Sequence, residues 1–202
     1  MSRKSCLSPF PARREAKVLV VSAGQISERD KPEVMLVLGG TRSGKSDWAL
    51  RYVEGRYRAP LYLATAEARD AEMAERIARH RRERGPGWGL VEEPREIVPI
   101  LARGGRREAD AVLVDCLTMW LTNILLTEGG PAADRGIDEL CTALREPGCP
   151  LVLVSNEVGM GIVPDSTLGR EFRDLAGMLN QRVAALSDRV VFVAAGLPLV
   201  LK

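Results

Sequence analysis

The chain has 202 residues, and its 29 Lys and Arg nearly cancel its 27 Asp and Glu, which leaves a formal net charge of +2. This balance gives no reason to expect duplex nucleic acid as a partner, and an aromatic content of 4% argues against a base-stacking surface for single strands. The four cysteines form no C-x-x-C pair and the chain has one histidine, so no zinc set is expected. Scattered single cysteines, with no apolar run of the ~18 residues that a transmembrane helix needs and no signal-peptide core, predict a cytoplasmic protein.

Residues 1–33 differ from the rest, with Pro9, Pro11, a mixed-charge stretch and no sustained period. We predict that they form an N-terminal extension of uncertain order ahead of one folded domain over 34–202. From residue 34 on, short apolar runs alternate with helical patterns. Strands are predicted at 34–38, 60–64, 111–115, 150–154, 189–195 and 198–202, and helices near 44–54, 70–84, 95–103, 116–127, 134–145 and 167–187.

The predicted strands are continuously apolar, which is typical of strands buried on both faces. Their alternation with helices predicts an α/β fold with a mainly parallel sheet flanked by helices. The last two strands are joined only by Gly196 and Leu197, a link too short for a crossover helix. We therefore expect a C-terminal antiparallel hairpin.

A phosphate-binding loop is predicted between the first strand and the first helix, where the sequence satisfies G-x-x-x-x-G-K-[ST]. Its residues are Gly39, Gly40, Thr41, Arg42, Ser43, Gly44, Lys45 and Ser46. Glycines let backbone N–H groups close around phosphates at a helix N-terminus. Lys45 is expected to reach the β- and γ-phosphates, and the Ser46 hydroxyl to ligate Mg²⁺. The alternative, a glycine-rich turn that binds nothing, does not account for the strand before the loop and the helix after it.

Asp115 stands at the end of the apolar run 111–115, where open α/β sheets place their ligands. A carboxylate there can hold Mg²⁺ directly or through water. The alternative is that Asp115 caps the following helix. The phosphate-binding loop upstream favours the metal role.

Two absent motifs narrow the class of nucleotide-binding protein. A regulatory GTPase carries Asn-Lys-x-Asp and Asp-x-x-Gly, but the candidate stretches 155–158 and 115–118 read SNEV and DCLT. A DNA-dependent motor needs a DNA-facing surface that the charge balance does not support. A small-molecule kinase or a nucleotidyltransferase remains.

His80 lies in the predicted helix 70–84, in the stretch AERIARHRRERG. At ~100° per residue, His80 falls about 20° from Met73, on the inward apolar stripe, whereas Arg82 points outward. By default such a histidine is a structural residue. However, neighbouring arginines disfavour the imidazolium and leave a neutral nucleophilic nitrogen, which permits covalent catalysis.

The sequence resembles the bifunctional adenosylcobinamide kinase / adenosylcobinamide-phosphate guanylyltransferase family of cobalamin biosynthesis. The resemblance runs from about Val34 to Lys202 and includes LVLGGTRSGKS, EMAERIARHRRERG, DCLTMWLTNIL and SNEVGMGIVP. It implies phosphorylation of adenosylcobinamide by ATP or GTP. It further implies transfer of GMP from GTP to adenosylcobinamide phosphate through a guanylylated histidine, which in this chain can only be His80. A RecA-like P-loop fold and a homotrimer are implied as well.

The resemblance also implies the nucleotide contacts. They fall on the loop Gly39–Ser46, on Thr65, Ala66 and Glu67 after the second strand, on Arg81, Arg82, Glu83 and Arg84, and on Glu92 and Asp115. Without the resemblance, Thr65 and Glu67 read as a strand-end turn with a helix cap, and Glu92 as a surface charge. Two other readings of the whole chain stay open: a monofunctional small-molecule kinase with a structural His80, and an interaction module that binds nucleotide without turning it over.

Overall fold

The computed structural model describes residues 31–67, 87–102 and 109–202, so the predicted helix over 70–84 lies outside the described residues. The strands are β1 (Val34–Gly39), β2 (Leu61–Ala64), β3 (Gly89–Glu92), β4 (Val112–Asp115), β5 (Leu151–Asn156), β6 (Arg189–Ala194) and β7 (Leu197–Val200). The helices are α1 (Lys45–Glu54), α3 (Val98–Ala102), α4 (Leu117–Glu128), α5 (Gly130–Ala143) and α6 (Thr167–Leu186).

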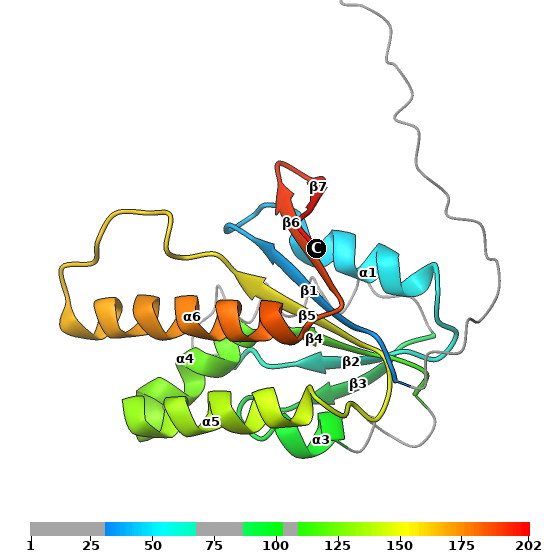
Figure 1. Cartoon of the computed structure of the whole chain (residues 1–202), viewed down its shortest axis with the longest axis horizontal. Helices are drawn as coiled ribbons and strands as arrows, with labels where there is room; N and C mark the ends of the chain where they lie inside the picture. Colours follow the sequence, from blue (N-terminus) through cyan, green and yellow to red (C-terminus); the bar gives the residue numbers. More distant parts are fainter. Residues whose placement is uncertain (1–30, 68–86, 103–108) are drawn as a thin grey trace, which may run out of the picture.

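The strands form one seven-stranded sheet in the order β3-β2-β4-β5-β1-β6-β7. Every neighbouring pair is parallel except β6 and β7, which pair antiparallel as the predicted hairpin. Figure 1 shows the arrowheads of β1, β2, β3 and β5 pointing to the same edge of the sheet. The predicted α/β architecture is confirmed, and the carboxyl ends of the parallel strands gather where such sheets bind ligands.

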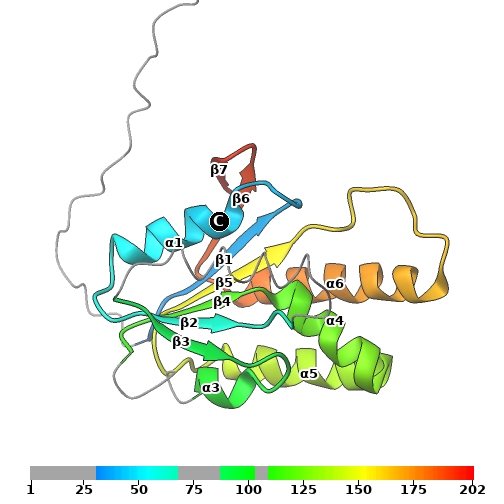
Figure 2. The ribbon, with the colours of Figure 1, turned by 180° about the vertical axis from the view of Figure 1, so that it is seen from behind.

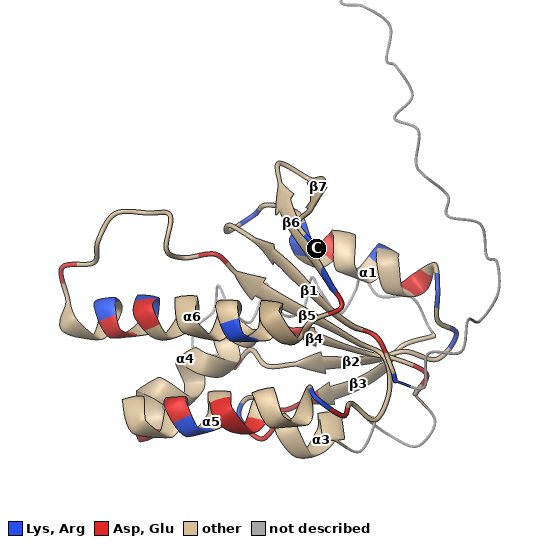
Figure 3. Cartoon of the chain, viewed as in Figure 1, with Lys and Arg blue, Asp and Glu red and all other residues tan. Residues whose placement is uncertain are grey.

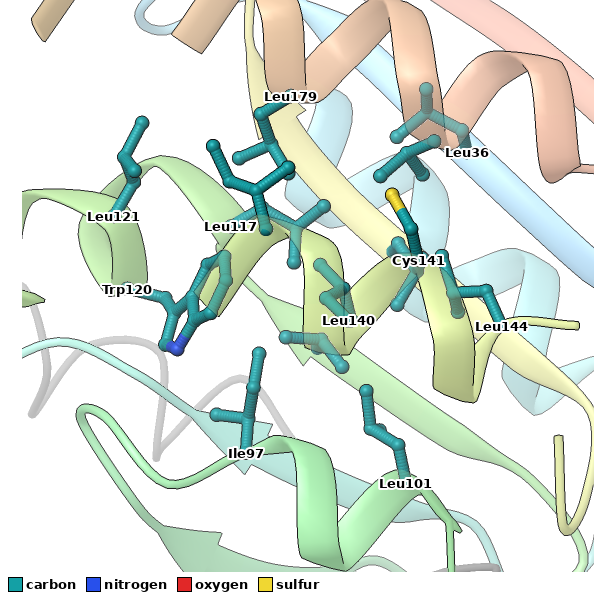
Figure 4. Close-up of a cluster of buried hydrophobic side chains, with 14 of the residues drawn as sticks. Leu36, Ile97, Leu101, Leu117, Trp120, Leu121, Leu140, Cys141, Leu144 and Leu179 are labelled. Carbon is teal, nitrogen blue, oxygen red and sulfur yellow. The ribbon is translucent and has the colours of Figure 1, made fainter. Parts of the chain in front are cut away.

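Helices cover both faces of the sheet, α1 on one face and α3, α4, α5 and α6 on the other (Figures 1 and 2). Because side chains alternate along a strand, Leu36 faces the larger helical layer and Val37 faces α1. Figure 4 shows the larger core, where Trp120 of α4 lies near Ile97 and Leu117. The Trp120 indole N–H donates to the Arg95 carbonyl at 2.7 Å, which satisfies its polar atom inside this core.

The structure departs from the sequence prediction at several elements, among them β7, which covers 197–200 rather than 198–202. Strand β3 was not predicted, because its residues GLVE are mostly exposed at the sheet edge and lack a continuous apolar run. Helix α3 begins at Val98 rather than at residue 95, and the predicted end at 103 lies outside the described residues. Helix α5 begins at Gly130 rather than 134, because Pro131 occupies its first turn, where a missing N–H costs nothing.

Charges of both signs are interspersed on the outer faces of α5 and α6 (Figure 3), and Arg182 of α6 forms an ion pair with Asp138 of α5 at 2.6 Å. Among the described residues, no helix combines the length and apolarity needed to cross a membrane.

Candidate active site

The phosphate-binding loop has the strand–loop–helix geometry that the motif predicts, since β1 ends at Gly39 and α1 begins at Lys45. Gly44 has φ 86°, a conformation that favours glycine. The Lys45 ammonium group is buried, with 5% of the residue exposed, and donates to the Gly40 carbonyl at 3.2 Å. Lys45 is therefore held beneath the loop, where the phosphates of a nucleotide would lie.

The β6–β7 turn packs against this loop. The Gly196 amide donates to the Ser43 carbonyl at 2.8 Å, and a Cβ on Gly44 would lie 3.2 Å from the Gly196 Cα. A Cβ on Gly39 would lie 2.5 Å from the Val193 carbonyl oxygen. Glycine is thus required at these positions by close backbone contact with β6 and its turn as well as by phosphate binding.

Asp115 ends β4 and accepts a hydrogen bond from the Tyr62 hydroxyl on β2 at 2.8 Å. The N-cap residue of α4 is Cys116, so Asp115 lies one residue before the cap position. Burial raises the pKa of the Cys116 thiol and the Asp115 carboxylate raises it further, while Lys45 lowers it. Charges of opposite sign, Asp115 and Lys45, therefore both act on the thiol at the start of α4.

The other predicted nucleotide contacts on β2 and β3 lie beside Asp115. The register opposes Ala64 to Asp115 on one side and to Glu92 on the other. Thr65 is fully buried, and its hydroxyl exchanges two 2.8 Å hydrogen bonds with the Cys116 backbone N–H and carbonyl. That hydroxyl therefore joins β2 to the start of α4. Ala66 and Glu67 follow at the same edge, both partly exposed.

His80, Arg81, Arg82, Glu83 and Arg84 lie outside the described residues. Within the part of the chain that the structure describes, no three His, Cys, Asp or Glu side chains gather as a metal site. The donors predicted for Mg²⁺, the Ser46 hydroxyl and the Asp115 carboxylate, are both oxygens of the kind that Mg²⁺ prefers, and a site with so few protein ligands suits an ion held partly by phosphates.

Sequence reasoning missed Tyr62, Thr118 and Asn156. Tyr62 lies in the interior of β2, and only the pairing of β2 with β4 brings its hydroxyl to Asp115. Asn156 ends β5, and its side-chain amide donates to the Thr118 hydroxyl of α4 at 3.1 Å. A polar residue directly after a buried strand was the available signal for Asn156; nothing in the sequence marks Tyr62.

Comparison with known proteins identifies the family of the chain. The model of the family "Cobinamide kinase / cobinamide phosphate guanyltransferase" matches residues 35–201. The bifunctional adenosylcobalamin biosynthesis protein CobP of Pseudomonas aeruginosa is 45% identical over 83% of this chain and 96% of its own length. The proteins CobU of Salmonella typhimurium and of Escherichia coli are 39% and 37% identical, each over 84% of this chain and 99% of their own length. The resemblance read from the motifs is thus confirmed: the chain belongs to the cobinamide kinase / cobinamide phosphate guanyltransferase family.

Proposed function

We propose that this chain first transfers the γ-phosphoryl group of ATP or GTP to the terminal hydroxyl of the aminopropanol arm of adenosylcobinamide. It then transfers GMP from GTP to the resulting phosphate, which yields adenosylcobinamide-GDP. The observation that carries the proposal is the phosphate-binding loop, with Lys45 buried beneath it and Asp115 at the end of a strand on the same edge.

In the kinase reaction, Lys45 binds the β- and γ-phosphates, and the loop amides hold the remaining phosphate oxygens. The Ser46 hydroxyl and the Asp115 carboxylate would hold Mg²⁺, which neutralises charge on the transferred group. The hydrogen bond from Tyr62 fixes the orientation of the Asp115 carboxylate. Thr65, Ala66, Glu67 and Glu92 are the proposed nucleotide contacts on β2 and β3.

In the second reaction, a neutral nitrogen of His80 attacks the α-phosphorus of GTP, the N–P bond forms, the bond to the bridging oxygen breaks and pyrophosphate leaves. The phosphate of adenosylcobinamide phosphate then displaces the histidine and takes the GMP. Arg81, Arg82 and Arg84 beside His80 provide positive charge that holds the nucleotide phosphates. Glu83 is a further proposed nucleotide contact.

Incubation with α-labelled GTP tests the covalent step. We expect an acid-labile, alkali-stable adduct on the wild-type protein, and no adduct on His80→Ala, which should keep measurable kinase activity. Lys45→Ala should damage both reactions. Absence of the adduct from the wild type, with kinase activity present, would favour the monofunctional kinase, and so would an equal loss of both reactions in His80→Ala.

We further propose a homotrimer in the cytoplasm. Strand β7 lies at the sheet edge and exposes apolar side chains, with Leu197 at 71% and Val200 at 63% exposure, as expected of a surface that meets another chain. The cysteines of the described residues, Cys116, Cys141 and Cys149, are all free, which fits a reducing compartment. Analytical ultracentrifugation of the wild type and of Leu199→Asp tests the assembly, because a charge in that edge should dissociate it.

A further inference from the structure

A chain of buried polar side chains crosses the core at the carboxyl end of β5. It links α6, β5 and α4 through Asn180, Ser155 and Thr118, which are 5%, 1% and 4% exposed. It ends at Asn156, the last residue of β5. Buried polar groups are hydrogen-bonded, and an acceptor that carries no proton fixes which partner donates in each bond.

The backbone carbonyl of Asn156 can only accept a hydrogen bond. It accepts from the Asn180 side-chain amide nitrogen at 3.1 Å, so the Asn180 oxygen must face Ser155, whose hydroxyl donates to it at 2.7 Å. Since Ser155 has spent its one proton, the 3.3 Å contact between Ser155 and Thr118 requires Thr118 to donate. The Thr118 oxygen is then left with lone pairs alone.

Those lone pairs fix the Asn156 side chain. Thr118 Oγ1 accepts from the Asn156 backbone N–H at 2.7 Å and from its Nδ2 at 3.1 Å, and Nδ2 also lies 3.8 Å from the Cys116 sulfur. If the Asn156 side-chain amide were flipped, its Oδ1 would face Thr118 Oγ1, which has no proton left to donate. Asn156 Oδ1 therefore points away from Thr118, and no residue of the described ranges 31–67, 87–102 and 109–202 donates to it.

Asn156 occupies the position between the two parts of the kinase site. Strand β5 lies between β1, which leads into the phosphate-binding loop, and β4, which ends at Asp115. Asn156 pairs with Gly39, and the next amide, that of Glu157, donates to the Gly39 carbonyl at 3.1 Å. The contact with the Cys116 sulfur places the side chain on the α1 face of the sheet, the face of Lys45.

We propose that Asn156 Oδ1 accepts a hydrogen bond from the hydroxyl group that receives the γ-phosphoryl group and so aims it at phosphorus. The inference rests on the kinase half of the proposed function. The hydroxyl oxygen bonds to the γ-phosphorus, the bond from phosphorus to the β–γ bridging oxygen breaks, and the nucleoside diphosphate leaves. The hydroxyl proton passes to solvent, because an amide oxygen is too weak a base to keep it.

The orientation of Asn156 Oδ1, a carbonyl oxygen that points away from Thr118, favours contact with a hydroxyl group. It cannot donate to phosphate oxygens and would repel them, so it needs a ligand that carries a proton. At the γ-phosphate end of the nucleotide, the acceptor alcohol brings such a proton. Thr118 acts through Asn156 and is a positioning residue, whereas Asn156 itself touches the substrate.

The test uses the full-length protein with ATP, Mg²⁺ and adenosylcobinamide. Asn156→Ala and Thr118→Val should each lower kcat for phosphorylation about tenfold or more, the effect of one lost hydrogen bond, while the Kd of a non-hydrolysable ATP analogue changes less than about twofold. Thr118→Ser keeps the hydroxyl and should retain kcat. Formation of the labelled GMP adduct, which uses no acceptor alcohol, should fall much less than phosphorylation in all three variants.

Several results would overturn the assignment. One is a kcat within about twofold of wild type in Asn156→Ala; another is a parallel loss of phosphorylation, adduct formation and nucleotide binding, which indicates a structural role. A kcat restored by saturating Mg²⁺ would assign the oxygen to metal-bound water instead. A wild type that binds the analogue and does not phosphorylate adenosylcobinamide would refute the proposed kinase activity itself. If Asn156→Ala unfolds, the Thr118→Val and Thr118→Ser pair decides alone.

Discussion

The amide of Gly196 donates a 2.8 Å hydrogen bond to the carbonyl oxygen of Ser43, which ties the β6–β7 turn to the phosphate-binding loop. The two are 153 residues apart in sequence and meet because β6 pairs with β1. The hairpin, which carries no motif of its own, therefore supports the loop through this hydrogen bond.

This contact predicts different effects for alanine at its two glycines. Gly196 has φ 78° and open space for a Cβ, so Gly196→Ala should lower the free energy of unfolding by only about 1 kcal/mol and leave nucleotide affinity nearly unchanged. Gly44 has φ 86°, and its Cβ would also lie 3.2 Å from the Gly196 Cα. Gly44→Ala should therefore cost more stability and weaken binding of an ATP analogue at least about tenfold, a loss of about 1.4 kcal/mol. Urea unfolding and calorimetric titration measure the two effects, and equal affinities of the two variants would contradict the prediction.

Tyr62→Phe removes the 2.8 Å hydrogen bond to Asp115 and keeps the aromatic ring. The loss of one hydrogen bond to a charged group, worth about 1.5–3 kcal/mol, should raise the Mg²⁺ concentration for half-maximal kinase activity at least several-fold. Tyr57→Phe is the matched control. Burial raises the pKa of Tyr57 to about 12. Its hydroxyl forms no hydrogen bond with a described side chain, so its removal should leave Asp115 unaffected. The two variants should differ in their Mg²⁺ titrations; identical titrations would show that Tyr62 does not orient the carboxylate.

The two serines of the phosphate-binding loop should respond in opposite ways. Ser43 Oγ is buried and has no hydrogen-bond partner among the described residues. A buried polar atom without a partner lowers the free energy of unfolding, and Ser43→Ala removes that atom. We expect the free energy of unfolding to stay the same or rise by about 1 kcal/mol, with kinase activity retained. Ser46→Ala should keep stability and lose kinase activity, because its hydroxyl is the proposed Mg²⁺ ligand. Thermal melts with activity assays check this, and a destabilised Ser43→Ala would mean that its hydroxyl has a partner.

Cys149 should resist alkylation in the folded protein. Burial, and to a smaller extent the Asp110 carboxylate, raise the pKa of its thiol to about 11. Since the thiolate is the reactive form, little of it exists near pH 8. The folded pKa lies above the ordinary value of 9.0, so this group's contribution to stability is present below about pH 9 and lost as the pH rises through 11. Iodoacetamide labelling with peptide mass mapping should find Cys149 modified only after unfolding in urea or at strongly alkaline pH; rapid labelling of the native protein at pH 8 would disprove the shift.

Most of the site's chemistry was accessible from sequence because it is locally encoded. The residues Gly39 to Ser46 lie between one strand and one helix, and Asp115 closes an apolar run, so pattern alone marked them. Asn156 lies in the stretch SNEVGMGIVP. Its proposed role, however, depends on Thr118 of α4 and Asn180 of α6, which lie far from it in sequence. Tyr62 looked like one more buried strand residue.

Local periodicity and turn chemistry are enough to specify the buried strands, the phosphate-binding loop and the C-terminal hairpin. The strand order, in which β5 lies between β1 and β4, depends on tertiary packing. Chain order does not encode that neighbourhood, because parallel strands are joined by helical crossovers of variable length. Strand pairing places Asn156 opposite Gly39. It also brings the Tyr62 hydroxyl to Asp115 and the Gly196 amide to the Ser43 carbonyl. These contacts satisfy polar groups of distant segments with one another, and that matching exists only once the sheet has formed.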